Sequence, residues 1–282
     1  MRLFLLTLVT MLAFAANSVL NRAGVGPGLI GPVSFAVIRL LAGAGMLGLL
    51  LVLRGWWRGG VVWPGWRGRA LGTPALLVYL FGFSLAYGAL DAGTGALILF
   101  GMVQITMFAG ALLAHEAVPV RRWIGAGMAF AGLVYLLAPG SAPAGHPMEA
   151  ALMAVAGIGW GLYSLSARGA RDPLSATGWN FILAVPVALV LWLALPADGT
   201  GMAPAGVALA ILSGAVTSGL GYALWYAVLP ALGPSRGAVA QLTVPIFAVA
   251  GGMAFLGEAL TLRFVIAAIL VLGGVGWALR AR

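Results

Sequence analysis

Residues 31–53 read GPVSFAVIRLLAGAGMLGLLLVL, an apolar run that holds a single charged side chain, Arg39. An α-helix rises about 1.5 Å per residue, so a helix over this run is long enough to cross the roughly 30 Å hydrocarbon layer of a bilayer. The whole chain has the same character, because 62% of its 282 residues are hydrophobic and 7% are charged. A water-soluble domain carries about 25% charged residues. The sequence therefore predicts an all-α membrane protein whose surroundings are the lipid bilayer.

Runs of this kind follow one another along the chain and leave no sizeable soluble domain. Prolines such as Pro32, Pro147 and Pro173, which start or stop helices, separate several of them. We expect ten transmembrane helices, at about residues 3–21, 31–53, 70–90, 93–114, 121–138, 148–167, 174–195, 204–228, 236–256 and 262–280.

The arginines predict how these spans are oriented. Short cytoplasmic loops of membrane proteins collect basic residues, and every basic residue of this chain is an arginine. With the N-terminus in the cytoplasm, the outer side holds only Arg22 and Arg263. The inner side then holds Arg2, Arg54, Arg58, Arg67, Arg69, Arg121, Arg122, Arg168, Arg171, Arg236, Arg280 and Arg282. We expect a multi-pass protein of the bacterial inner (plasma) membrane with both termini in the cytoplasm.

The second half of the chain repeats features of the first. A shift of 142 residues aligns Gly95-Ala96 with Gly237-Ala238 and Glu116-Ala117 with Glu258-Ala259. We therefore expect two repeats, residues 1–140 with the first five spans and residues 146–282 with the last five. Because each repeat has an odd number of spans, the two copies cross the membrane in opposite directions. Inverted repeats of this kind are typical of secondary transporters, whose substrate site lies near the midplane between the halves.

Several short motifs resemble the EamA family of the drug/metabolite transporter superfamily over essentially the whole chain. They are Gly221-Tyr222-Ala223-Leu224-Trp225-Tyr226, Pro245, Gly257-Glu258-Ala259-Leu260, His115-Glu116-Ala117-Val118, Phe35 with Arg39, and Trp160 with Arg168. The resemblance implies an inverted-repeat transporter fold of ten helices. Among the branches of this family we expect a likeness to aromatic amino acid exporters of the YddG type, because the expected site carries many rings.

Polar and aromatic residues inside the spans are the candidate substrate-binding residues. The aromatic candidates are Tyr79, Phe83, Trp160, Tyr163, Tyr222 and Trp225, and the buried amides are Gln104 and Gln241. A single interior ring more often serves packing, but the set suits an apolar site with few polar anchors. Pro245 cannot donate to the carbonyl of Gln241, so a kink should leave that carbonyl open to a substrate; a simple packing kink is the alternative.

Arg39 is the one charge well inside a span, and we assign it a gating or structural role. It should face the bundle interior or a water-filled cavity. In one interpretation, Arg39 binds an anionic group or a gating partner. In the other, Arg39 is structural, and helix ends and backbone carbonyls accept its hydrogen bonds. No carboxylate lies near the middle of a span, so we expect facilitated movement down a gradient rather than a buried proton relay. Glu116 and Glu258 are expected to cap or ion-pair the following helix.

The composition also removes whole classes of chemistry. The chain has no cysteine, so it has no disulfide, thiolate metal site or cysteine nucleophile. We find no metal-ligand spacing and no catalytic triad, and we therefore predict no catalytic residues, no metal and no cofactor. The formal charge of +9 reflects membrane orientation rather than nucleic acid binding.

These features together predict an inner-membrane secondary transporter that exports small amphipathic metabolites, above all amino acids, including aromatic ones, by alternating access. The alternative is a polytopic membrane enzyme acting on lipid or isoprenoid substrates, although such an enzyme needs clustered acidic ligands or a nucleophile beside a base. An ion channel is a third class, which the apolar interior disfavours. The partner is a small-molecule substrate. The sequence leaves substrate identity, direction, energy coupling and oligomeric state open, and it is compatible with a monomer.

Overall fold

The computed structural model describes residues 1–115, 119–138, 145–167, 170–195 and 200–279, and within these ranges the regular elements are all helices. The helices are α1 (Arg2–Val25), α2 (Pro32–Arg58), α3 (Arg69–Ala86), α4 (Ala92–Leu113), α5 (Val120–Leu137), α6 (Pro147–Ser166), α7 (Pro173–Ala194), α8 (Pro204–Leu212), the π-helix η2 (Ser213–Leu220), α9 (Gly221–Gln241), α10 (Val244–Leu256) and α11 (Leu262–Leu279). Some residues used above for the repeat, the family motifs and the orientation lie outside the described residues: Glu116, Ala117, Val118, Arg168, Arg280 and Arg282.

Ten apolar helical stretches confirm the predicted multi-pass membrane fold. Eight are long and apolar enough to cross a membrane, the eighth running through α8 and η2 into α9 over Pro204–Leu229. Two shorter apolar helices, Val244–Leu256 and Leu262–Trp277, follow them. Prolines occupy the first turns of α2, α6, α7, α8 and α10, where the missing N–H is not needed for the helix and the fixed φ favours it.

The ninth predicted span is interrupted. We expected the eighth span to end at about 228 and one kinked helix over 236–256. Instead α9 runs through the expected connection and ends at Gln241, and α10 starts at Val244. The N–H of Thr243 donates to the carbonyl of Ala240, and the N–H of Phe247 donates to that of Thr243, both at 3.0 Å. Pro245 is the cause, because its ring excludes the preceding helical turn while fitting the first turn of a new helix. The Gln241 carbonyl lies at this break.

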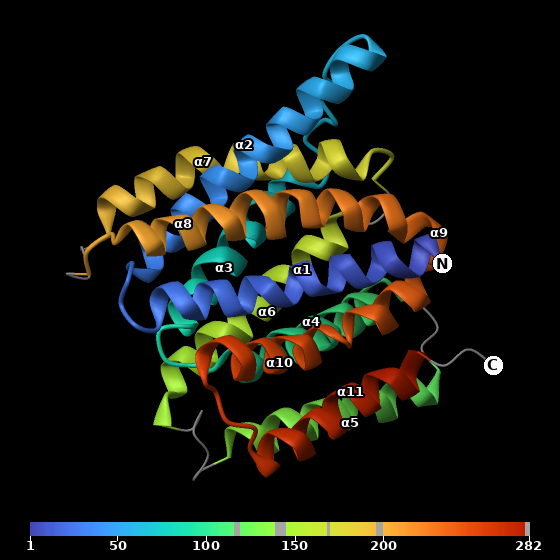
Figure 1. The fold of residues 1–282 in the computed structure, drawn as a ribbon. Helices are drawn as coiled ribbons and strands as arrows, with labels where there is room; N and C mark the ends of the chain where they lie inside the picture. The colour runs from blue at the N-terminus through green and yellow to red at the C-terminus, as the bar shows by residue number, and fades with distance from the viewer. Residues whose placement is uncertain (116–118, 139–144, 168–169, 196–199, 280–282) are drawn as a thin grey trace.

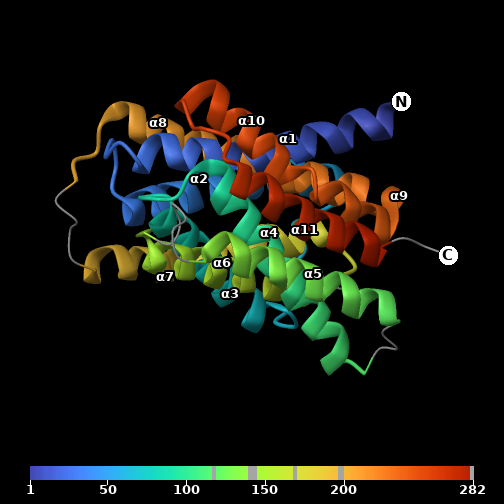
Figure 2. The same cartoon turned by 90° about the horizontal axis from the view of Figure 1, so that it is seen from below.

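Helices from the first half of the chain pack against helices from the second half. Helix α1 packs against the α8–η2–α9 stretch and α10, and α6 packs against α3 and α4. Helix α2 lies against α7, α4 against α10, and α5 against α11. Figure 1 shows α5 and α11 side by side at one edge of the bundle, away from α2 and α7, and Figure 2 shows the same pair from below. The start of α1 and the end of α11 lie at the same end of the bundle in both views, as an even number of crossings requires.

Glycines allow the central helices to approach closely. A Cβ added to Gly159 of α6 would lie 2.9 Å from the Tyr79 nitrogen of α3, and one added to Gly157 would lie 2.7 Å from the Leu99 carbonyl oxygen of α4. A Cβ on Gly214 of η2 would collide with the backbone oxygen of Arg39 in α2. Small residues let membrane helices pack in this way without a hydrophobic driving force. These contacts hold the backbone of η2 close to Arg39 and the backbone of α6 close to Tyr79.

Candidate substrate site

The six predicted aromatic side chains gather in one buried cluster. Tyr79 and Phe83 come from α3, Trp160 and Tyr163 from α6, and Tyr222 and Trp225 from α9; each is at most 7% exposed. The ring of Trp160 lies at the centre, with centroid distances of 4.9 Å to Tyr79, 5.3 Å to Tyr163 and 5.1 Å to Tyr222. At these separations the rings touch. Residues more than 140 positions apart in the sequence thus form one aromatic surface.

Three further rings belong to this cluster and were not predicted. Tyr87, at the end of α3, lies 4.7 Å from Phe83. Phe14 of α1 lies 5.6 Å from Tyr222 and 5.8 Å from Trp225, and Phe181 of α7 lies 5.8 Å from Tyr222. A sequence signal for Phe14 existed, because a shift of about 146 residues, which aligns the starts of the two halves, places Phe14 on Trp160 and Phe35 on Phe181. Phe181 had the weaker signal of aligning with Phe35.

Arg39 is fully buried beside these rings. Its Nε donates to the Ser218 hydroxyl at 3.1 Å, and its Nη2 donates to the Tyr79 hydroxyl at 2.8 Å. The guanidinium carbon lies 5.3 Å from the ring centre of Tyr79 and 4.9 Å from that of Phe83. The partners recorded for Arg39 are therefore hydroxyls and ring faces, not the helix ends and backbone carbonyls of the structural reading. Among the described residues, its Nη1 has no hydrogen-bond partner.

Asn17 of α1 organises the polar side of the cluster. Its Oδ1 accepts hydrogen bonds from the hydroxyls of Ser213 at 2.8 Å, Thr217 at 2.6 Å and Ser218 at 3.2 Å. All three donors lie on the π-helix η2, whose i→i+5 winding is common at functional sites. Because Ser218 also accepts from Arg39, Asn17 indirectly positions the guanidinium. The sequence analysis missed this network, and its signal was three small hydroxyl residues within one apolar span.

The cluster and its polar network draw on both halves of the chain. The first half contributes α1, α2 and α3 through Phe14, Arg39 and Tyr79. The second half contributes α6, α7 and the η2–α9 stretch through residues such as Trp160 and Tyr222. The pair α5 and α11 lies at the edge of the bundle (Figure 1).

Gln104 lies on α4, Gln241 at the end of α9, and Pro245 in the first turn of α10. Gln104 is half-buried on α4, two residues from Met102, which faces Gly157 of α6; two residues turn a helix by about 200°, so Gln104 lies on the face turned away from α6. Gln241 is half-buried at the break before α10, and Pro245 is buried in the first turn of α10. A binding role for these three residues stays a prediction.

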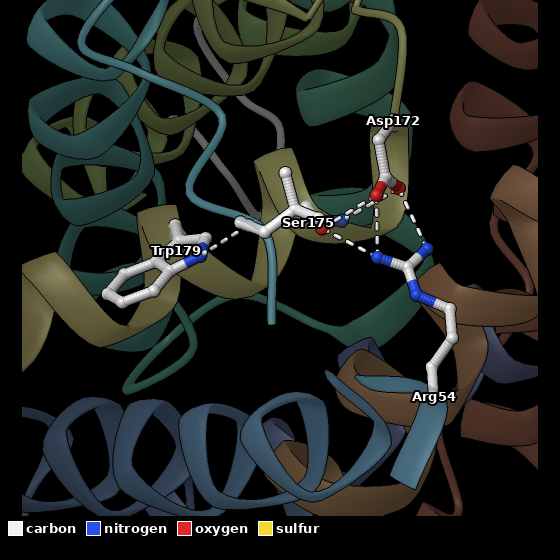
Figure 3. A network of polar contacts seen from close by, with 5 residues as sticks. Arg54, Asp172, Ser175 and Trp179 are labelled. Atoms are coloured by element: carbon white, nitrogen blue, oxygen red, sulfur yellow. Dashed lines mark hydrogen bonds and ion pairs between the residues drawn. The ribbon is translucent and has the colours of Figure 1, made fainter. Parts of the chain in front are cut away.

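A compact charged network joins α2 to α7 at one end of the bundle. Arg54 donates two hydrogen bonds to the Asp172 carboxylate, at 2.9 and 2.5 Å, and a third to the Ser175 hydroxyl at 2.6 Å. Figure 3 shows the guanidinium facing Asp172 and Ser175. Burial alone would raise the pKa of Asp172, but the hydrogen bonds from Arg54 and Ser175 outweigh it and hold that pKa at about 2. Asp172 also caps α7 through the Ser175 N–H.

A second charged network lies at the other end. Glu258, between α10 and α11, accepts the N–H of Ala92 at 2.8 and 3.0 Å, and its nearest contact to Arg22 is 3.9 Å. Arg22 donates to the carbonyls of Tyr87 and Gly88. Glu258 therefore caps α4 and not, as expected, the following helix, because the chain folds the start of α4 against the end of α10. Glu116, the other half of that prediction, lies outside the described residues.

Comparisons with known proteins agree with this architecture. Residues 147–280 match the model of the EamA-like transporter family. The chain is 46% identical over 291 aligned residues to an uncharacterized protein of Pseudomonas aeruginosa, covering 100% of this chain and 96% of that protein. A solved crystal structure of a protein, 21% identical, superposes with a TM-score of 0.68 and covers 97% of both chains, which establishes the likeness of fold. The chain belongs to the EamA-like transporter family.

Proposed function

We propose that the protein is a secondary transporter of the bacterial inner membrane that exports small amphipathic metabolites, above all amino acids, including aromatic ones as YddG-type exporters do. The observation that carries this proposal is the buried ring cluster around Trp160, which meets the polar network of Arg39 and Asn17 between the two halves of the chain. Ring faces suit an apolar side chain, and the polar groups suit the charged end of an amino acid.

Alternating access between two inverted five-helix halves, residues 1–140 and 146–282, is the proposed mechanism. The corresponding contacts of α1 with α8–η2–α9 and of α6 with α3 support it, as does the pairing of α2 with α7. The networks of Arg54–Asp172 and Arg22–Glu258 lie at opposite ends and each tie one half to the other. Opening one end while the other stays closed would expose the ring cluster to one side at a time.

Transport down the substrate's own gradient is the proposed driving force. The four carboxylates that the structure describes, Asp91, Glu149, Asp172 and Glu258, all lie at or beyond helix ends. Proton-coupled carriers keep an ionisable side chain on the pathway inside the membrane. We therefore expect substrate flux to persist when a pH gradient is collapsed.

Counterflow in proteoliposomes tests the proposed function. Vesicles loaded with an unlabelled amino acid should take up the same labelled amino acid, faster for aromatic members of a panel, with protein-free vesicles as the control. Collapse of the pH gradient with an ionophore should leave this uptake unchanged. Absence of saturable uptake for every member of the panel would contradict the proposed function. Uptake that requires a pH gradient, and loses that requirement when one carboxylate is neutralised, would contradict the driving force alone.

A further inference from the structure

The guanidinium of Arg39 is incompletely satisfied. It has five N–H donors, and its recorded hydrogen bonds use Nε and Nη2, while Nη1 is buried with no partner among the described residues. The side chain is 0% exposed, so the unpaired donors face protein and not bulk water. Leaving a buried charged donor unpaired is costly, more so inside a membrane span. A buried guanidinium with unpaired donors points to a ligand that accepts hydrogen bonds from those donors.

No carboxylate of the described chain completes it. Asp172 pairs with Arg54, Glu258 caps α4 beside Arg22, Asp91 occupies the N-cap position of α4, and Glu149 lies in the first turn of α6. Arg39 is eight residues into α2, roughly 10 Å along the helix from its start. The missing partner must therefore come from outside the described residues.

We infer that Arg39 binds the carboxylate of the transported molecule through its unpaired Nη1. A guanidinium presents planar donors that fit a carboxylate in a charge-assisted, bidentate geometry. The hydrogen bonds to Ser218 and Tyr79 hold the guanidinium plane in place, and Asn17 in turn holds Ser218. Asn17 and the hydroxyls are neutral, so they orient the charge without neutralising it.

The neighbouring rings indicate the chemistry of the rest of the transported molecule. Tyr79, which holds the guanidinium, is 4.9 Å from Trp160, and Trp160 is 5.1 Å from Tyr222. An apolar or aromatic side chain next to a carboxylate at Arg39 would replace these ring-to-ring contacts with ring-to-ligand contacts. The substrate class is therefore a carboxylic acid with an apolar or aromatic body. This inference rests on the proposed function for the identity of the cargo, and it adds that the carboxylate is the group the site requires.

Three related ligands separate the carboxylate from the ammonium group. L-phenylalanine carries both, 3-phenylpropionate keeps only the carboxylate, and L-phenylalaninamide keeps only the ammonium. In competition against labelled phenylalanine, we expect the acid 3-phenylpropionate to compete and the amide to compete at least tenfold more weakly. The purified protein should also gain thermal stability with 3-phenylpropionate and not with the amide. Equal effects of the acid and the amide on the wild-type protein would overturn the inference.

Variants of Arg39 give the second arm of the test. Arg39→Gln should raise the half-inhibitory concentration of 3-phenylpropionate at least tenfold, and Arg39→Lys should recover part of the loss because it restores the charge without the planar fork. Unchanged stabilisation of folded Arg39→Gln by 3-phenylpropionate would also overturn the inference. If Arg39→Gln does not fold, the acid and amide comparison on the wild type decides.

The two claims fail in different ways. Stabilisation of the wild type by 3-phenylpropionate, without transport of any amino acid, would leave the Arg39 site standing and reject the proposed function. Saturable transport of phenylalanine that the amide inhibits as well as the acid does would leave the proposed function standing and reject the carboxylate site.

Discussion

The two charged networks at the ends of the bundle each bring an arginine next to a carboxylate but differ in strength. Arg54 donates two hydrogen bonds to Asp172 and a third to Ser175. Arg22, by contrast, lies 3.9 Å from Glu258 and donates its hydrogen bonds to backbone carbonyls. The pKa values of the two carboxylates move in opposite directions. That of Asp172 falls to about 2, while burial raises the pKa of Glu258 above its ordinary value despite the Ala92 N–H, with the charge of Asp91 adding to the rise.

This difference indicates which end opens more readily. A charge-assisted, bidentate pair is among the stronger polar contacts, and its low carboxylate pKa keeps Asp172 ionised at any physiological pH. At the other end the protein disfavours the ionised form of Glu258, so that network contributes less at neutral pH. We therefore expect the Arg54–Asp172 end to be the more firmly closed one.

The largest expected effect concerns which end of the bundle faces the cytoplasm, because a reporter reads either cytoplasmic or periplasmic. The arginine distribution predicts that the Arg54 end faces the cytoplasm, so a reporter fused after Arg282 should read cytoplasmic and one inserted near Ala144 should read periplasmic. Alkaline phosphatase and green fluorescent protein fusions measure this directly. A periplasmic C-terminus would overturn the predicted orientation and put the Arg54–Asp172 network on the periplasmic side.

Breaking the firmer network should open its end of the bundle. Leu51 of α2 is 2% exposed and packs on Gly178 of α7, and the chain has no native cysteine, so Leu51→Cys gives a single label site one turn from Arg54. Adding Asp172→Asn should raise its labelling rate by a membrane-impermeant maleimide about tenfold, since losing such contacts costs roughly 1.5 kcal/mol.

The matched control is Glu258→Gln on the same Leu51→Cys background. It alters the looser network at the opposite end and should leave the labelling rate within about twofold of the parent. Equal acceleration by both substitutions would show that the two ends are not independent.

The smallest expected effect is the opposite pH dependence of the two carboxylates. A lowered folded-state pKa stabilises the protein above the ordinary value of 3.8 and loses this contribution as pH falls toward about 2. A raised pKa does the reverse, so the Glu258 contribution grows as pH falls toward its ordinary value of 4.5. The melting temperature of the wild type relative to Asp172→Asn should therefore fall between pH 4 and 2, and relative to Glu258→Gln it should rise as pH falls from 7 toward 4.5. Differences of the same sign would refute the contrast.

Much of the fold was predictable from the sequence because membrane helices are set by local composition. Apolar length and flanking prolines predicted most of the helices, but they placed the boundary between the eighth and ninth spans at about 228–236, where α9 continues to Gln241. The chemistry of proline predicted a kink near Pro245 but not that the helix would end there. The capping of α4 by Glu258 could not be predicted, because it depends on a contact between residues 166 positions apart. Sequence periodicity carries no information about contacts between residues so far apart in the chain.

The candidate site was predictable in its rings and unpredictable in its polar groups. Interior aromatic residues such as Trp160 stand out in a hydrophobic span. Asn17 and Ser218 do not, because a membrane helix tolerates small polar residues that bond to its own backbone. Their role depends on the packing of α1 against η2, which brings Asn17 and Ser218 together. Likewise, Arg39 was identified as unusual, but its partners required the three-dimensional arrangement.

The most direct test of a substrate site between the two halves is transport by folded variants of its proposed residues. Trp160→Ala should lower the initial rate of amino acid counterflow about tenfold or more, because it removes the ring at the centre of the cluster. Gln241→Ala should lower it to a similar extent, because it removes the amide predicted to hydrogen-bond the substrate, and such a loss costs about 1 to 3 kcal/mol. Trp56→Ala is the matched control, because Trp56 is 87% exposed on the protein, and it should transport normally. If folded Trp160→Ala and Gln241→Ala both transport at the wild-type rate with unchanged affinity, the substrate site lies elsewhere.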